Sequence, residues 1–421
     1  MELRAICLIL AAIFLWGTFS ARAAAISTPI FFVAIGVVMA QGLNLLSLEL
    51  DPHLIKVVAE VTLVWVLFAD ASRVKVADLR ADRGRYLRLL ALGLPLTIAL
   101  GAVVAVAVLG LSPWYALLVG AALAPTDAAL GSAVMSDRRV PRRVRQTLNV
   151  ESGLNDGIAT PVVILALGAI ATAAGLDNES TGHALIGLLL GVVVGVVIGA
   201  GGGALLRIAR RRGWSSDEFA GPAVLALALL AYSGAVLIDA NGFVSAFVGG
   251  SAYGAFGGRG GEKEVYYVEQ TCGLASMISW FVFGAVLIPA LIAGWTWQIL
   301  LYAVLSLTVV RMLPVAISLL GSRMDRATVL FVGWFGPRGL ASIVFALIAL
   351  EGLHDVEGPI DEVVGTIGLT VLLSVLAHGL SARPLAGRYA TSRGGQLDEP
   401  QHPEPTVRRF VSQASDPHER Q

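Results

Sequence analysis

A glutamate, a serine, an asparagine and an aspartate lie in the stretch ESGLNDGIATP, whose continuation PVVILALGAI is apolar enough to lie in a lipid bilayer. Ionisable groups inside a membrane are costly, so their presence there indicates a function. At about 100° per residue, Ser152 and Asp156 share one face of a helix, and Glu151 and Asn155 share a neighbouring face. We therefore expect one helix that presents two polar faces.

Asp156 has the chemistry of an exchange site. No basic residue lies within a helical turn of it. A carboxyl group desolvated at membrane depth can exchange a proton in the physiological range, and it is also a hard oxygen ligand for a small alkali cation such as Na⁺. Ser152, Thr126 and backbone carbonyls would be its neutral co-ligands. Proton and cation would then compete for one site; a purely structural role for the aspartate is the alternative.

Two apolar windows contain helix-breaking motifs in their middle. Residues 113–136 contain APTD, and residues 327–351 contain GPRG. Proline removes a backbone donor and clashes with the preceding turn. Freed backbone groups at membrane depth are tolerated only where they are buried or line a polar cavity. Two interrupted segments at corresponding positions of two halves are typical of an inverted-repeat transporter with its site at the midplane.

The two interruptions carry charges of opposite sign. Broken helices leave positive amino ends and negative carboxyl ends facing one another. Asp127 has the sign that neutralises the amino ends, and Arg338 has the sign that neutralises the carboxyl ends. We expect both to balance the charges of the crossing, and exposure of Asp127 to the ion path stays open as an alternative.

The other intramembrane charges need partners. Glu151 requires a cation if it stays ionised, and Arg311 is the best remaining candidate within a span. We expect an ion pair between them; the alternative is that Arg311 reaches the membrane boundary. Glu60 could line an ion path or have a structural role. Asp70 is expected in a solvated funnel, and His378 is expected to pack.

The composition is that of a polytopic membrane protein. Of 421 residues, 56% are hydrophobic and 14% are charged, and the mean hydropathy is +0.77. A soluble domain usually carries about 25% charged residues. Cys7 and Cys272 lie in apolar stretches, which indicates packing rather than a disulfide or metal framework. The sequence has no nucleotide-binding lysine loop, HExxH zinc motif or nucleophile elbow, so we expect no enzyme, no cofactor and no nucleic-acid partner.

Windows long enough to cross about 30 Å of hydrocarbon recur along residues 1–382. We predict an all-α fold with thirteen spans at about 4–21, 25–46, 54–71, 86–110, 113–136, 146–174, 182–208, 218–239, 241–257, 267–294, 296–321, 327–351 and 361–382. The fifth and twelfth are the broken ones. Residues 383–421 are polar and proline-bearing, so we expect a disordered cytoplasmic tail.

Basic residues gather in alternate loops. The clusters are Arg73 to Arg88, Arg138 to Arg145, Arg207 to Arg212, Arg259 with Lys263, Arg323 with Arg326, and the arginines after the last span. The opposite loops are acidic or neutral. The basic-residue rule therefore places the amino terminus outside and the carboxyl terminus in the cytoplasm. A cleaved signal peptide at the start would reverse this arrangement, so we expect the first segment to be retained.

Together these motifs resemble the monovalent cation/proton antiporter family, in the branch of electroneutral sodium/proton exchangers, over residues 4–382. ESGLNDGIATP resembles its Glu-Ser-x-x-Asn-Asp motif, APTDAAL its unwound Thr-Asp segment and GWFGPRG its Gly-x-Arg-Gly segment. Arg311 lies where the family places an arginine partner for the glutamate. Ala128 replaces a common proline, which leaves the local shape of the crossing open.

The resemblance implies a fold and a set of roles. It implies a thirteen-helix homodimer that associates through the first helices, with a core bundle that moves against the dimerisation domain. Asp156 would carry cation and proton, with Thr126 and Ser152 as co-ligands, and Asn155 would steady the crossing. Relatives that move two protons have an Asp-Asp pair, whereas position 155 is asparagine here. One carrier carboxylate implies one-for-one, electroneutral exchange.

The sequence thus predicts a sodium (or lithium)/proton antiporter of the cytoplasmic membrane that extrudes sodium and serves pH homeostasis. A potassium/proton antiporter on the same scaffold is the first alternative, because the sequence determines the acid but not the cavity radius. A sodium-coupled solute symporter is the second, and it would need another polar pocket near the crossing.

Overall fold

The computed structural model describes the chain from Leu3 to Ser392 with interruptions. The described residues are 3–20, 22, 27–42, 52–74, 82–175, 181–258, 261–288, 291, 294–322, 324–354 and 356–392. Within these ranges every regular element is a helix. The predicted all-α fold with thirteen spans is confirmed, because each span coincides with one helix or with consecutive helical segments.

Seven spans are single helices. They are α1 (Leu3–Phe19), α3 (Pro52–Arg73), α9 (Arg142–Ala173), α10 (Thr181–Arg211), α11 (Asp217–Val236), α12 (Gly242–Phe256) and α19 (Ile360–Ser392). By length and composition, six helices among the described residues could cross a membrane unaided. Helix α19 extends beyond residue 382, and the rest of the expected tail, 393–421, lies outside the described residues.

The other spans depart from a regular α-helix. Those with a π-helical turn are α2 (Thr28–Val37) with η1 (Val38–Gly42), α5 (Arg83–Arg88) with η2 (Leu89–Gly93) and α6 (Leu94–Leu109), and α13 (Gly261–Val282) with η3 (Phe283–Leu287). Those that are broken are α7 (Pro113–Ala122) with α8 (Ala128–Met135), α15 (Trp297–Leu307) with α16 (Val309–Ser318), and α17 (Arg326–Trp334) with α18 (Leu340–Gly352).

The two predicted breaks cross each other. The backbone N–H of Asp127, in the fifth span, donates to the carbonyl of Pro337, in the twelfth, at 2.8 Å. Each unwound segment therefore satisfies a backbone group of the other, which is how irregular backbone is tolerated at this depth. A third break, at Thr308 in the eleventh span, was not predicted; Thr308 leaves the helical region with ψ −88° before α16 begins.

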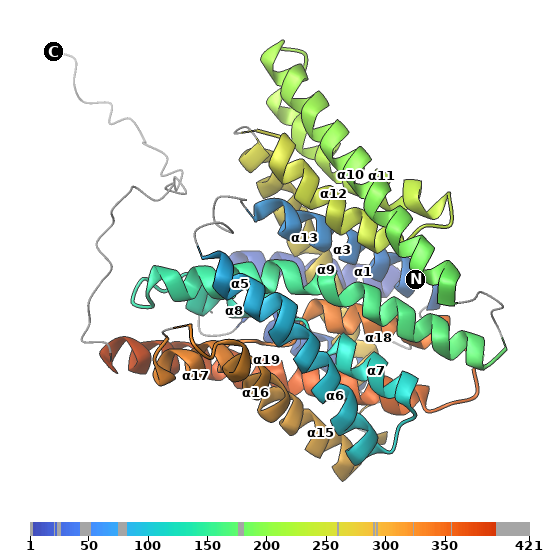
Figure 1. The fold of residues 1–421 in the computed structure, drawn as a ribbon, viewed down its shortest axis with the longest axis vertical. Coiled ribbons are helices and arrows are strands. Elements are labelled where there is room, and N and C mark those ends of the chain that lie inside the picture. The colour runs from blue at the N-terminus through green and yellow to red at the C-terminus, as the bar shows by residue number, and fades with distance from the viewer. Residues whose placement is uncertain are drawn as a thin grey trace.

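The helices form two groups that meet at the centre of the molecule (Figure 1). One group contains α10, α11 and α12 at the top of the view, followed by α3 and α13. The other contains α6 and α15 to α19 at the bottom, and α9 runs across the middle. Helices α9 and α18 both contact α3. Helix α18, which follows the second break, thus packs against α3 of the other group.

Candidate functional site

A cavity of about 420 Å³ lies between the two groups of helices. Its walls include Asp70 and Arg73 of α3, Glu269 of α13, Asp127 at the first break and Asp156 of α9. Other wall residues, Met135 and Ser136, lie where α8 ends. The ends of α3 and α8 adjoin arginine-rich loops, so the cavity lies on the side of those loops.

Asp156 is at the deep wall of this cavity. Its side chain is only 7% exposed, and its Oδ1 atom has no hydrogen-bond partner among the described residues. Beside it, Gly157 faces the ring of Phe247, where a Cβ would lie 2.1 Å from Phe247 Cδ2. Only glycine allows α9 to approach α12 this closely. Helix α9 therefore packs closely against α12 next to Asp156, and Asp156 itself lines the cavity.

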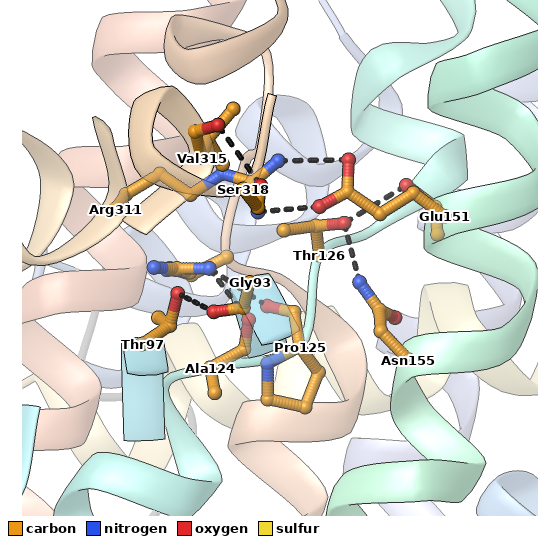
Figure 2. A network of polar contacts seen from close by, with 12 residues as sticks. Gly93, Thr97, Ala124, Pro125, Thr126, Glu151, Asn155, Arg311, Val315 and Ser318 are labelled. Carbon is orange, nitrogen blue, oxygen red and sulfur yellow. Dashed lines mark hydrogen bonds and ion pairs between the residues drawn. The ribbon is translucent and has the colours of Figure 1, made fainter. Parts of the chain in front are cut away.

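A hydrogen-bonded cluster of polar side chains lies at the first break, where Figure 2 shows Thr126 next to Asn155. Thr126 Oγ1 and Ser152 Oγ are 2.9 Å apart and share a hydrogen bond. Asn155 Nδ2 donates to Thr126 Oγ1 at 2.7 Å. The amide thus ties α9 to the unwound segment and orients the threonine hydroxyl. Ser152 is one helical turn from Asp156 on the same face of α9, as its spacing predicted.

Glu151 lies one helical turn before Asn155 on the same face of α9 and pairs with Arg311. Arg311 Nη1 donates to Glu151 Oε1 at 2.6 Å, and Nη2 donates to Oε2 at 3.0 Å. Both side chains are buried, and the two-point geometry is the strong form of an arginine–carboxylate pair. The structure places together the two residues that the sequence analysis paired. The pair joins α9 to α16 (Figure 2).

Asp127 and Arg338 lie against helix ends of opposite polarity. Asp127 accepts from the backbone N–H of Leu130 at 3.1 Å and from that of Leu340 at 3.0 Å, so its carboxylate joins the amino ends of α8 and α18. Arg338 Nη1 donates to the carbonyls of Ala124 at 2.8 Å and Pro125 at 3.3 Å, at the carboxyl end of α7. Each charge opposes the helix dipole that it meets. Asp127 also faces the cavity, as the alternative allowed.

Glu60 is not brought together with Asp156. It accepts a hydrogen bond from Tyr232 at 3.3 Å, and it is not among the residues that line the cavity. Its geometry matches the structural alternative rather than an ion path.

Sequence reasoning missed two kinds of residue. Glu269 and Arg73 line the cavity but lie near span ends, where charges are common. Ser374 and His378 of α19 support the second break: Ser374 Oγ accepts from the Arg338 N–H at 2.6 Å, and His378 Nε2 is 2.8 Å from the carbonyl of Trp334. A serine and a histidine four residues apart in an apolar helix were the available signal.

The arrangement can hold one small cation or one proton. Within the described residues, no group of three acidic, histidine or cysteine side chains is placed to hold a metal ion. A cation at Asp156 would therefore depend on one carboxylate together with hydroxyl and carbonyl oxygens, which are hard neutral ligands. A polytopic helical fold with two crossing broken helices at a buried carboxylate is the architecture of an inverted-repeat secondary transporter.

The chain belongs to the family described as "Sodium/hydrogen exchanger, transmembrane", which it matches over residues 8–387. It is 27% identical over 371 residues to the K(+)/H(+) antiporter NhaP of Alkalimonas amylolytica, covering 86% of this chain and 62% of the relative. It is 26% identical over 395 residues to the K(+)/H(+) antiporter NhaP2 of Shewanella baltica, covering 91% and 65%. The chain thus spans less than two thirds of the length of these relatives.

The fold is similar to that of a solved structure. The sodium proton antiporter MjNhaP1 from Methanocaldococcus jannaschii superposes with a TM-score of 0.76 at 21% sequence identity, covering 93% of this chain and 99% of that one. The identification as a member of the cation/proton antiporter family is confirmed by the family match and is accompanied by a shared fold.

Proposed function

We propose that the protein exchanges a monovalent cation for a proton across a membrane by alternating access. The observation that carries the proposal is the position of Asp156: a buried carboxylate with a free oxygen, at the deep wall of a cavity that lies on one side of the crossing. A cation or a proton neutralises this carboxylate, and the neutral form crosses the low-dielectric interior at lower cost than the charged form. The protein is then a transporter and not an enzyme.

Exchange follows from competition at the single carboxylate. In the cavity-facing state, Asp156 releases a proton or a cation and takes up the other, with Thr126 and Ser152 completing the cation's shell. Movement of α9 and the group that contains α15 to α19 against the group that contains α3 opens the site to the opposite side of the membrane. Asn155 is neutral and is engaged with Thr126, so one carboxylate carries one charge per half-cycle. The exchange is therefore one-for-one and electroneutral.

The proposed cation is sodium or lithium, with potassium as the second candidate. A carboxylate with hydroxyl co-ligands is a hard site, which suits small alkali cations. The structural neighbour MjNhaP1 is described as a sodium proton antiporter. Potassium is supported by the relatives from Alkalimonas and Shewanella, which are named K(+)/H(+) antiporters. A solute symporter would need a second polar pocket near the crossing.

The setting of this activity is also a proposal. The arginine-rich loops support a cytoplasmic carboxyl terminus and an external amino terminus in the cell membrane, and the cavity then faces the cytoplasm. A proton gradient would drive sodium out of the cell and contribute to pH homeostasis. A homodimer through the first helices is proposed from the family resemblance.

The test is cation-driven proton movement in proteoliposomes that contain an internal pH dye. Sodium, lithium, potassium and choline are added in turn, with the membrane potential clamped, to wild type and Asp156→Asn. We expect a signal with sodium or lithium that survives the clamp and disappears in the variant. Glu60→Gln is the matched control, because it removes an intramembrane carboxylate outside the cavity, and it should retain exchange.

Each outcome has a distinct meaning. If only potassium evokes proton movement, the transported cation is potassium and the proposed mechanism still holds. A response that collapses under the clamp contradicts one-for-one exchange. Undiminished exchange in Asp156→Asn, or no proton movement with any cation, overturns the proposed function.

A further inference from the structure

A charged triad lines the cavity mouth. Arg73 and Asp70 lie three residues apart on α3, and Glu269 reaches them from α13. Arg73 Nε is 2.8 Å from Glu269 Oε1, whereas Arg73 Nη1 is 3.8 Å from Asp70 Oδ1. The guanidinium therefore makes its close contact with Glu269 and only a long one with Asp70.

All three side chains are partly open to water. The exposed fractions are 45% for Arg73, 25% for Glu269 and 22% for Asp70. The cavity they line also contains Asp156. Asp70 and Glu269 thus place two carboxyl groups in the cavity from which Asp156 would be loaded.

The Arg73 side chain places one positive charge in that cavity. Its guanidinium has five N–H donors and a flexible stem, so it can pair with either carboxylate within reach. Asp70 is three residues away on the same helix, the spacing at which opposite charges pair along a helix face. Without Glu269, the guanidinium would close on Asp70 and neutralise it.

We propose that Glu269 is a positioning residue that sets the apparent cation affinity of the cavity, by holding the Arg73 guanidinium away from Asp70. The inference rests on the proposed function, because it concerns how the cation is recruited toward Asp156. Glu269 acts through Arg73 and has no contact with the transported ion. The triad therefore controls KM for the cation and leaves the maximal rate unchanged.

A double-mutant cycle separates this mechanism from a general effect of charge. KM and maximal rate for the transported cation are measured in proteoliposomes for wild type, Glu269→Gln, Arg73→Gln and the double variant. We expect Glu269→Gln to raise KM by about three- to five-fold, the factor set by a partly exposed ion pair, with the maximal rate unchanged. In the Arg73→Gln background the same substitution should leave KM unchanged, because no guanidinium remains to be released.

A simple loss of negative charge predicts a different result. Glu269→Gln would then raise KM by the same factor whether or not Arg73 is present. Glu269→Asp keeps the carboxylate and should restore most of the wild-type KM. Asp137→Asn breaks a comparable ion pair, with Arg139 outside the cavity, and serves as the matched control.

The failures are distinguishable. If wild type moves no protons with any cation, the proposed function fails. If wild type exchanges and Glu269→Gln leaves KM unchanged, lowers the maximal rate instead, or has the same effect in both backgrounds, only the inference about Glu269 is overturned.

Discussion

The two broken spans differ in what surrounds them. The break between α7 and α8 reaches the cavity through Asp127, and the buried hydroxyls of Thr126 and Ser152 share a hydrogen bond there. At the break between α17 and α18 the cavity is lined by the apolar Leu340 and Ala341, and Arg338 is fully buried. The first break thus places a carboxylate at the cavity, and the second directs its arginine to the carbonyls of the first.

The break between α17 and α18 is held by two residues of α19, the last span. Ser374 accepts from the Arg338 N–H where α18 begins, and His378 contacts the Trp334 carbonyl where α17 ends. The His378 ring also stacks on Trp334 with centroids 5.1 Å apart. The proposed function places ion exchange at the first break, and these contacts give the second break a structural role. Substitutions of these supporting residues should therefore change stability, and substitutions of the hydroxyl residues at the first break should change affinity.

The largest stability effect is expected from the buried Glu151–Arg311 pair, in which Arg311 packs against Gly336 of the second break. Glu151→Gln leaves the Arg311 guanidinium buried without its carboxylate, which should cost about 3–5 kcal/mol of unfolding free energy. Adding Arg311→Met removes the orphaned charge and should recover much of that loss. Thermal unfolding of the purified single and double variants measures both steps. Additive losses would show that the pair is not coupled.

Two serines provide a direct comparison of the breaks. Ser374→Ala leaves the buried N–H of Arg338 unpaired and should cost about 1–3 kcal/mol with KM unchanged. Ser152→Ala removes a hydroxyl from the cavity-side cluster and should raise KM for the cation with a smaller loss of stability. Unfolding temperature and KM are measured in parallel for both variants. The same response in both would remove the distinction between the breaks.

The smallest effect is expected at His378. His378→Leu keeps apolar contact with Trp334 but loses the ring nitrogen that contacts its carbonyl, which should cost about 1 kcal/mol. The pH profile of exchange should be unchanged, because the residue supports a helix end and does not face the cavity. A shifted profile would contradict the assignment of this region to support alone. His378→Gln, which retains a donor, is the conservative control.

Much of the candidate site could be predicted because its signals are local. Prolines at 125 and 337 indicate breaks, and a four-residue spacing places Ser152 and Asp156 on one face. The Glu151–Arg311 pair was also accessible, although the two lie 160 residues apart, because few intramembrane cations were available. The break at Thr308 could not be predicted, because no glycine or proline lies at that position.

The sequence by itself determined the thirteen spans, the two predicted breaks and the charges at the crossing, because hydropathy, proline geometry and helical periodicity act over a few residues. Only the tertiary structure decided which polar faces share a cavity. Glu60 and Asp70 lie in the same helix, yet one pairs with Tyr232 and the other lines the cavity with Glu269. That division depends on which neighbouring helices pack against each turn of α3, which no local pattern encodes.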